Sequence, residues 1–336
     1  MRKLVLLVTA ILATATLTSC AANDTGDETK IRFALDWTPN TNHTGLYVAM
    51  QEGFFKQAGL DVEIIPYGET APDSLLDAGS AEFGISFQSS ATFAKASGAN
   101  IVSVLAPLQH WATAIGVRAD NAAITRPKDL DGKTYAGFGD AGEIEAIKQV
   151  IRNDGGTGDF KNITLGTSAY EAVYSGAADF TVPFVAWESI EAQHNGTPFK
   201  SFAYTDFGFP DIYAVVVDAN QTWVKAHPDQ ARKFVQALQR GYQVAADDPD
   251  KAAQDLIDAN PGAFPDRALV TESQKLLAEK YLRDPQGRVG RQTLEQWTGY
   301  SHFLFEHRLL VDESGKPLAT EPNWSTYFTN EYLAPA

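Results

Sequence analysis

The side chains best suited to holding a small ligand gather in one loop near the start of the chain. An apolar strand is predicted over Ile31–Leu35, and the loop after it carries Trp37, Asn42 and His43. A helix is predicted to follow at once, with Thr44 as its candidate N-cap. In open α/β sheets, ligands bind at this position, beyond the carboxyl end of a strand. The loop therefore predicts a binding site; the alternative is a loop built only for turning, with Trp37 in the core.

Further candidate ligand-binding residues lie in or beside the other predicted strand-end loops. They are aromatic rings that can stack on a flat ligand and polar groups that can hydrogen-bond to it. These additional residues are Tyr67, Gln88, Trp111, Tyr174, Trp187 and Glu188. Glu188 directly follows a predicted strand, where its carboxylate could form a charge-assisted hydrogen bond, about twice as strong as a neutral one. The alternative for Glu188 is an acid placed at a helix N-terminus by the helix dipole.

The elements that must position these residues alternate between strands and helices. Apolar runs that read as strands cover residues 31–35, 62–66, 83–87, 101–106, 114–118, 134–137, 163–165, 180–184 and 213–217. Helices are predicted between them, and the chain from Thr222 to about Phe305 is predicted to be helical. This alternation of strands and helices, joined by short polar loops, indicates an α/β fold with doubly wound parallel sheets. Because 336 residues exceed what one hydrophobic core usually supports, two domains are expected.

The N-terminus has the pattern of an export signal. Arg2 and Lys3 precede an apolar stretch that ends in Leu17-Thr18-Ser19-Cys20, so residues 1–19 are predicted to be a signal peptide. The end of this stretch resembles the bacterial lipobox, which implies lipidation of Cys20 and a lipidated tether over residues 20–30. An ordinary secreted protein with an incidental thiol is the alternative. Cys20 is the only cysteine, so no disulfide can form within the chain.

Charge limits the class of ligand. The chain carries 27 Lys and Arg residues against 42 Asp and Glu residues, which argues against nucleic acid as a partner. The loop Gly137–Glu143 weakly matches a phosphate-binding G-x-G-x-x-G pattern, but Asp140 and Glu143 would repel an anion there. A neutral or cationic ligand is therefore expected.

The sequence lacks the motifs of common enzymes. Ser89 and Ser90 have no G-x-S-x-G around them, and no pair of histidines has metal-binding spacing. We therefore predict no catalytic residue, no metal and no cofactor, and a protein that is not an enzyme.

Three segments carry a resemblance to a known family. The first, Asp36–Gly45, resembles the substrate-binding lipoproteins of the thiamine-precursor group, which belong to the larger family related to the yeast thiamine-pyrimidine synthase. The other two, Glu52–Leu60 and Arg126–Lys133, are shared broadly with nitrate-, sulfonate- and taurine-binding proteins. The resemblance covers residues 30–225 well and the helical C-terminal part only loosely.

The resemblance implies a fold and a way of binding. The expected fold is that of the type II periplasmic binding proteins, two α/β lobes joined by a hinge, with the ligand in the interlobe cleft. Lobe 1 would comprise residues 31–113 and 218–336, and lobe 2 residues 114–217. The two crossovers would fall near Trp111–Arg118 and Val217–Thr222.

The implied function is that of the substrate-binding lipoprotein of an ABC importer. It would capture a thiamine pyrimidine precursor, of the formylaminopyrimidine or hydroxymethylpyrimidine class, and deliver it to the permease and ATPase subunits. The protein would be exported, anchored to the membrane through Cys20, and monomeric. The Trp187-Glu188 pair matches a position at which the family places a ligand-contacting acid.

Two alternatives stay open. One is the same fold with another solute, such as a riboflavin-like ring, nitrate, a sulfonate or taurine. The other is an enzyme like the iron-dependent pyrimidine synthases of this superfamily. Those synthases carry a cysteine-rich motif, whereas this chain has Cys20 alone.

Overall fold

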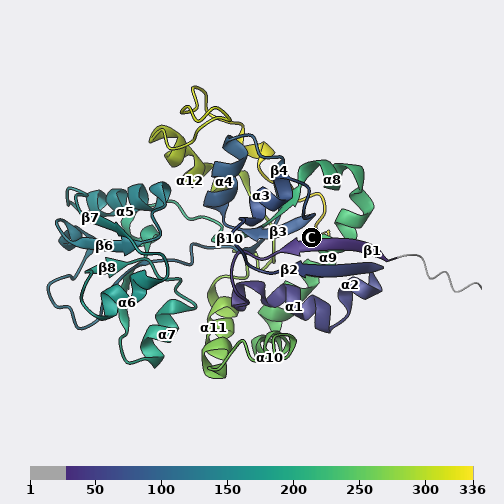
Figure 1. The fold of residues 1–336 in the computed structure, drawn as a ribbon, viewed down its shortest axis with the longest axis horizontal. Coiled ribbons are helices and arrows are strands. Elements are labelled where there is room, and N and C mark those ends of the chain that lie inside the picture. Colours follow the sequence, from purple (N-terminus) through teal and green to yellow (C-terminus); the bar gives the residue numbers. More distant parts are fainter. Residues whose placement is uncertain (1–27, 336) are drawn as a thin grey trace, which may run out of the picture.

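The computed structural model describes residues 28–335 as two α/β lobes side by side (Figure 1). Each lobe is built on a five-stranded sheet, with strand order β2-β1-β3-β10-β4 in the first lobe and β7-β6-β8-β5-β9 in the second. The predicted signal peptide, Cys20 and most of the predicted tether lie outside the described residues. Their roles stay predictions.

The elements of the first lobe come from both ends of the described chain. Its strands are β1 (Thr29–Ala34), β2 (Leu60–Ile65), β3 (Phe83–Ser86), β4 (Ile101–Leu108) and β10 (Val215–Asn220). Its helices are α1 (Thr44–Gln51), α2 (Phe54–Gln57), α3 (Pro72–Asp77), α4 (Gln88–Ala96), α8 (Gln221–Ala226), α9 (Pro228–Asp247), α10 (Pro249–Ala259), α11 (Arg267–Lys280) and α12 (Leu294–Glu306).

The elements of the second lobe form one continuous stretch. Its strands are β5 (Ile115–Arg118), β6 (Thr134–Gly137), β7 (Lys161–Thr164), β8 (Phe180–Thr181) and β9 (Phe199–Phe202). Its helices are α5 (Ala141–Asn153), α6 (Ser168–Tyr174) and α7 (Glu188–His194). The α/β class is confirmed, and the carboxyl ends of the parallel strands β1 and β2 carry the loops with Trp37, Asn42, His43 and Tyr67.

Each sheet is mixed, because one strand in each lobe departs from the predicted parallel arrangement. Strand β10 pairs antiparallel with β3 and β4, and β5 pairs antiparallel with β8 and β9. Each of these strands follows a crossing from the other lobe, so the chain enters the sheet in the reverse direction. The second crossing occupies residues 203–214 and not Val217–Thr222, because β10 pairs within the first sheet from Val215 to Asn220.

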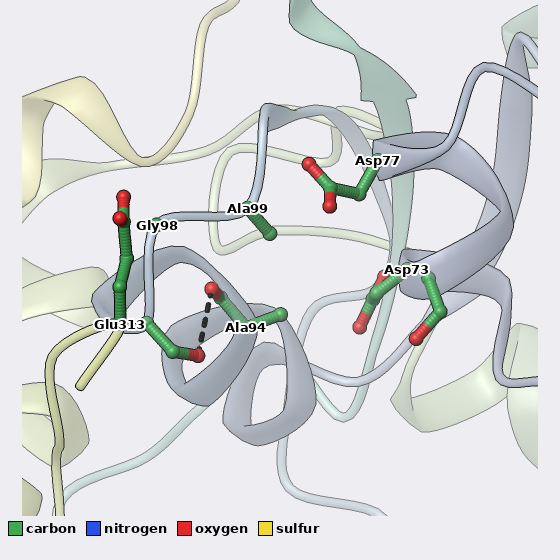
Figure 2. A pocket seen from close by; sticks show the side chains of 8 residues that line it. Asp73, Asp77, Ala94, Gly98, Ala99 and Glu313 are labelled. Atoms are coloured by element: carbon green, nitrogen blue, oxygen red, sulfur yellow. Dashed lines mark hydrogen bonds between the residues drawn. The ribbon is translucent and has the colours of Figure 1, made fainter. Parts of the chain in front are cut away.

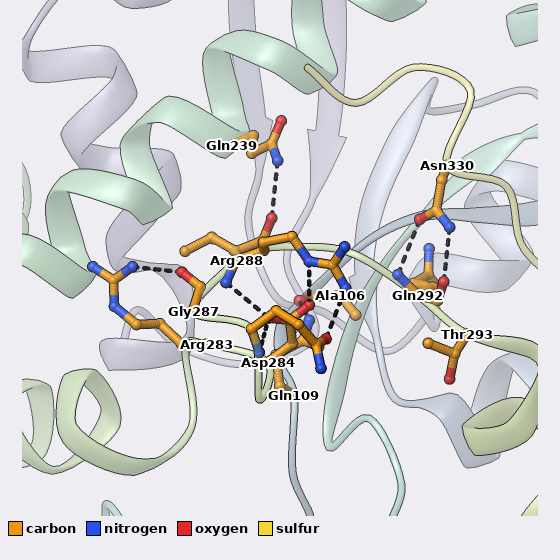
Figure 3. Close-up of polar contacts among 12 residues, drawn as sticks. Ala106, Gln109, Gln239, Arg283, Asp284, Gly287, Arg288, Gln292, Thr293 and Asn330 are labelled. Carbon is orange, nitrogen blue, oxygen red and sulfur yellow. Dashed lines mark hydrogen bonds and ion pairs between the residues drawn. The ribbon is translucent and has the colours of Figure 1, made fainter. Parts of the chain in front are cut away.

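The prediction of continuous helix to Phe305 is also wrong, because residues 281–293 form an irregular segment between α11 and α12. Gly287 and Gly290 have φ values of 78° and 83°, in the left-handed region that interrupts a helix. The segment is held by polar contacts (Figure 3): Asp284 accepts from Arg288 Nε at 2.7 Å, and the Gln239 amide donates to the carbonyl of Val289 at 2.9 Å.

Close packing of α1 on α9 fixes the loop that precedes α1. A Cβ added at Gly241 would lie 2.0 Å from the carbonyl oxygen of Gly45, so the two helix backbones touch and only glycine fits. The neighbouring Tyr242 donates its hydroxyl to the carbonyl of Asn42 at 2.7 Å. Helix α9, which also packs Phe234 on Phe83 at 4.1 Å between ring centroids, therefore positions the end of the Asp36–His43 loop.

Candidate ligand-binding site

The loop after β1 is held by hydrogen bonds among its own residues. Thr44 is the first residue of α1 and not its N-cap, a position that His43 takes. Asn40 instead caps the short 3₁₀ turn Thr41–His43, because its Oδ1 accepts from the backbone N–H of Asn42 at 2.8 Å. His43 Nδ1 lies 3.2 Å from the backbone N–H of Asn40, and Nε2 lies 2.7 Å from Asp36 Oδ1. Since Nδ1 accepts, Nε2 carries the proton and donates to Asp36. His43 is fully buried with both nitrogens in use, so it holds Asp36 and the loop in place.

Asn42 presents an unused acceptor. Its side chain is 7% exposed, and Oδ1 has no hydrogen-bond partner among residues 28–335. A buried polar atom without a partner costs free energy, on the order of 1–3 kcal/mol. Oδ1 of Asn42 is therefore an acceptor that a bound molecule could satisfy.

Aromatic rings of the two lobes meet beyond the ends of β1 and β6. Trp37 lies 4.9 Å from Tyr67, which follows β2, with ring planes tilted by 44°. It also lies 6.5 Å, edge to face, from Phe138, which follows β6 in the second lobe. Tyr67 is 47% exposed and Phe138 43% exposed, so both keep open faces. These three residues form what we call the ring group.

Phe138 was not predicted as a site residue. It lies between Gly137 and Gly139, directly after β6, in the loop with the weak G-x-G-x-x-G match. An aromatic residue between two glycines at the end of a predicted strand is the sequence signal that indicates it. Tyr170 of α6 lies behind it, with ring centroids 6.3 Å apart.

Glu188 begins helix α7 in the second lobe. Its Oε2 accepts from the backbone N–H of Phe184 at 3.0 Å, which orients the carboxyl group. Burial raises the pKa of Glu188 to about 7. Close by, the hydroxyl groups of Tyr174 and Ser189 are buried without a partner in the described part of the chain. Burial, and then the negative charges of Glu191 and Glu188, raise the pKa of Tyr174 to about 12.

Gln88 and Trp111 were predicted to contact the ligand, and the structure places them at the connections between the lobes. The fully buried amide of Gln88 accepts from the backbone N–H of Tyr213 at 2.9 Å and donates to the carbonyl of Gln296 at 3.1 Å. Trp111 stacks on Tyr204 at 4.3 Å, with ring planes 11° apart. Both side chains thus brace the crossing segments and lie outside the ring group.

Trp187 is likewise in contact with protein. Its ring packs edge to face on Phe264, between α10 and α11, with centroids 6.3 Å apart. The predicted site residues therefore divide into two sets. Tyr67 is exposed, Asn42 and Tyr174 each have a buried polar atom without a partner in the described residues, and Trp37 and Glu188 are partly buried. His43, Gln88, Trp111 and Trp187 are held by contacts with other parts of the chain.

The N-terminus of α5 is occupied by the chain's own carboxylates. Asp140 Oδ1 accepts from the backbone N–H of Glu143 at 2.7 Å, the position that a bound anion would take. The hydroxyl of Tyr135 donates to Glu143 Oε1, and burial raises the pKa of Glu143 to about 7. The weak G-x-G-x-x-G match is thus filled by acids, as the sequence indicated.

Several buried acids have a raised pKa, and from this we predict that they make the unliganded protein less stable as pH rises toward neutrality. Burial raises the pKa of Glu143 and Glu188 to about 7 and that of Asp73 to about 6. Between about pH 4 and 7 the folded form therefore binds more protons than the unfolded chain, so its stability falls as pH rises. We expect Glu143→Gln to raise the melting temperature at pH 8 by about 2 °C or more and to change it little at pH 5.

Thermal unfolding at the two pH values measures this effect. Glu145→Gln is the matched control, because Glu145 lies on the same helix and pairs with Lys148 at 2.5 Å. An equal gain at pH 5 and pH 8 for Glu143→Gln would show that the carboxyl charge is not the cause.

A pocket of about 460 Å³ lies elsewhere, between the ends of α3 and α4 (Figure 2). It is lined by Asp73, Asp77 and Glu313 with small residues, and no aromatic ring reaches it. Within residues 28–335 no cluster of acids, histidines or cysteines is arranged to hold a metal ion. In the same range no helix is long and apolar enough to span a membrane.

The fold has well-characterised relatives. The periplasmic aliphatic sulphonate binding protein SsuA from Escherichia coli superposes with a TM-score of 0.65 at 15% identity, over 88% of this chain and 94% of that one. The two lobes thus have the fold of the periplasmic binding proteins. Residues 40–252 match the model of the family described as NMT1/THI5 like, and the chain belongs to that family.

Two curated relatives are similar to nearly the whole chain. The formylaminopyrimidine-binding protein of Halalkalibacterium halodurans is 28% identical over 95% of this chain and 98% of its own length. The 4-amino-5-hydroxymethyl-2-methylpyrimidine phosphate synthase THI13 of Saccharomyces cerevisiae is 24% identical over 91% of this chain and 88% of its own.

Proposed function

We propose that this protein is the extracytoplasmic substrate-binding component of an ABC importer, and that it captures a pyrimidine precursor of thiamine. The observation that carries the proposal is the ring group. Trp37 and Tyr67 from the first lobe and Phe138 from the second converge at the strand ends, with Tyr67 and Phe138 about half exposed. A flat heterocycle between these faces would gain stacking and would be shielded from water when the lobes close.

The polar groups among the candidate site residues suit an aminopyrimidine. Such a ring is weakly basic and carries an exocyclic amino group, so it needs an acid beside a ring nitrogen and acceptors beside the amino group. Glu188 would supply the acid from the second lobe, and Asn42 Oδ1 would accept from the amino group. The buried hydroxyl groups of Tyr174 and Ser189 would complete the polar contacts.

The acids around α5 favour a ligand without a phosphate or sulfonate group. Asp140 occupies the helix N-terminus that would otherwise attract an anion, and Glu143 lies beside it. A sulfonate, nitrate or phosphorylated pyrimidine would meet these carboxyl groups, whereas a neutral aminopyrimidine would not.

The relatives support binding of a pyrimidine. They include both a binding protein and synthases, so two classes of protein have to be weighed for this chain. The relative from Halalkalibacterium halodurans is named for binding formylaminopyrimidine, and it aligns over 95% of this chain. The synthase relatives are less similar, and the cysteine-rich motif of the iron-dependent synthases is absent, because Cys20 is the only cysteine. His43, held by Asp36 and Asn40, would act as a positioning residue. We therefore propose a receptor and not an enzyme.

The remaining partners follow from this role. A receptor of this kind delivers its ligand to a permease driven by an ATPase. Cys20 would be lipidated and would anchor the domain to the outer face of the cell membrane through the tether that ends at residue 30. The protein would act there as a monomer.

Titration calorimetry tests the proposal. The chain from residue 28 onward, which holds every described element, would be titrated with formylaminopyrimidine, hydroxymethylpyrimidine, its phosphate, thiamine, riboflavin and taurine. We expect micromolar or tighter binding, about 8 kcal/mol or more, for an unphosphorylated pyrimidine alone. Selective binding of riboflavin or taurine would keep the fold and overturn the ligand assignment. No binding to any of them would refute the ring-group site.

A further inference from the structure

Helix α7 of the second lobe packs beside α11 of the first lobe (Figure 1). Trp187, which precedes the helix, packs on Phe264 as described above. His194, the last residue of the helix, reaches α11. The same helix begins with Glu188, the proposed ligand-binding acid, so its docking is tied to the geometry of the site.

His194 lies between two carboxylates of the first lobe. Its Nδ1 is 2.8 Å from Asp266 Oδ2, and its Nε2 is 3.0 Å from Glu272 Oε2. A neutral imidazole has one N–H and could donate only one of these hydrogen bonds. Both bonds together require the imidazolium ion, with a proton on each nitrogen. The contact between the lobes therefore contains a bound proton.

The surroundings favour that positive charge. Asp266 stays ionised as the N-cap of α11, since its Oδ1 accepts from the backbone N–H groups of Ala268 and Leu269 at 3.0 and 3.1 Å. The elements packed together here carry further charged residues: Glu188 and Glu191 on α7, Lys200 on β9, and Arg267, Lys275, Glu279 and Lys280 on α11. Lys275 pairs with Asp250 of α10. Lys200 and Arg267 are engaged elsewhere, with the carbonyl of Asn121 and the amide of Gln254.

We propose that His194 is a proton-dependent latch that holds the two lobes together, so that acidification favours the closed form and tightens ligand binding. Opening about the crossing segments would separate α7 from α11 and break both hydrogen bonds. Asp266 and Glu272 raise the pKa of His194 above its ordinary value, and opening would return it toward that value.

The direction of the pH effect follows from that raised pKa. Closing takes up a proton, so the latch is fully formed below the ordinary pKa of histidine. It is lost as pH rises through the pKa of the closed form. The effect on ligand affinity rests on the proposed function, whereas the effect on closure does not.

The expected effect of pH on ligand affinity is modest, because the side chains of the latch are partly exposed. His194 is 24% exposed, and the carboxylates of Asp266 and Glu272 are 46% and 54% exposed, so water and salt screen the pair. We expect the latch to make binding about threefold tighter at pH 6 than at pH 8 in low salt. The gain should shrink in 0.5 M NaCl.

The first test compares affinities for formylaminopyrimidine at pH 6 and pH 8. Glu188 also titrates near neutrality, so the pH effect on affinity is not due to the latch alone. The contribution of the latch is therefore measured as the difference between the wild type and His194→Gln in the ratio of their affinities at pH 6 and pH 8. A second variant, Glu272→Gln, removes one carboxylate without touching the cap of α11. His302→Gln is the matched control, since His302 lies between Glu306 and Glu321 within the first lobe alone.

The second test needs no ligand. The chain from residue 28 contains no cysteine, so Lys161→Cys on β7 and Lys225→Cys on α8, at opposite ends of the molecule (Figure 1), can carry a fluorescent donor and acceptor. We expect energy transfer in the wild type to change between pH 8 and pH 6, and this change to be reduced in His194→Gln and Glu272→Gln but kept in His302→Gln.

The two tests separate the latch from the proposed ligand. An identical response of the wild type and both latch variants, in affinity and in energy transfer, would overturn the latch. If no pyrimidine binds, the proposed function fails, and energy transfer alone decides whether His194 holds the lobes.

Discussion

Glu188→Gln is expected to weaken binding of formylaminopyrimidine by more than about tenfold at pH 6.5 while leaving the fold intact. The glutamine keeps an acceptor for the backbone N–H of Phe184, which now bonds Oε2 at 3.0 Å. It cannot hold the proton that a carboxyl group and a ring nitrogen share. A hydrogen bond to a charged group contributes about 1.5–3 kcal/mol, and each 1.4 kcal/mol is a factor of ten in affinity.

The pH profile gives a second readout of the same group. Because burial raises the pKa of Glu188 to about 7, its carboxyl group holds a proton below neutrality and can offer it to the ring nitrogen. Above pH 7 both partners lose that proton, so the wild-type affinity should fall as pH rises to 8.5. Glu188→Gln should remove this part of the pH dependence. Glu171→Gln, an exposed acid on α6, is the control and should bind like the wild type.

A contradictory outcome is easy to recognise. If Glu188→Gln binds the pyrimidine as tightly as the wild type, the acid does not touch the ligand. In that case its position at the first residue of α7 is explained by the helix dipole alone.

Much of the first lobe and of its loops could be predicted from local sequence signals. Apolar runs gave β1, β3 and β4 within a few residues, and the polar loop Asp36–His43 lies at the end of β1 as expected. Tyr67 and Trp37 follow neighbouring parallel strands, so their meeting at one edge of the sheet follows from the order of the strands. These inferences succeed because they depend on short segments.

Features that depend on contacts between distant segments could not be predicted. The edge strand β9 was missed because it is short and partly exposed, and it is defined only by pairing with β5. The contacts of Gln88 with Tyr213 and of Trp111 with Tyr204 depend on where the crossing segments pack, which no local pattern reports. The break between α11 and α12 is different, since Pro285, Gly287 and Gly290 are local signals in the sequence that indicate it.

Trp37→Ala should weaken binding of the pyrimidine by more than about tenfold without unfolding the protein. Trp37 is only partly buried, and its ring contacts Tyr67 and Phe138, which are themselves about half exposed. Removing it deletes one stacking face and leaves little cavity in the core. Loss of an aromatic contact and of the apolar area it covers is worth roughly 2–3 kcal/mol of binding free energy.

Calorimetry and thermal unfolding of the same preparations distinguish a binding ring from a core ring. Trp223→Ala is the matched control, because Trp223 packs edge to face on Phe83, in the interior of the first lobe, and contacts no member of the ring group. That variant should lose stability and keep its affinity. If Trp37→Ala instead melts at a much lower temperature while its folded molecules bind as tightly as the wild type, Trp37 belongs to the core. Phe138→Ala should then be tested as the remaining interlobe ring, because its 43% exposure excludes a core role for it.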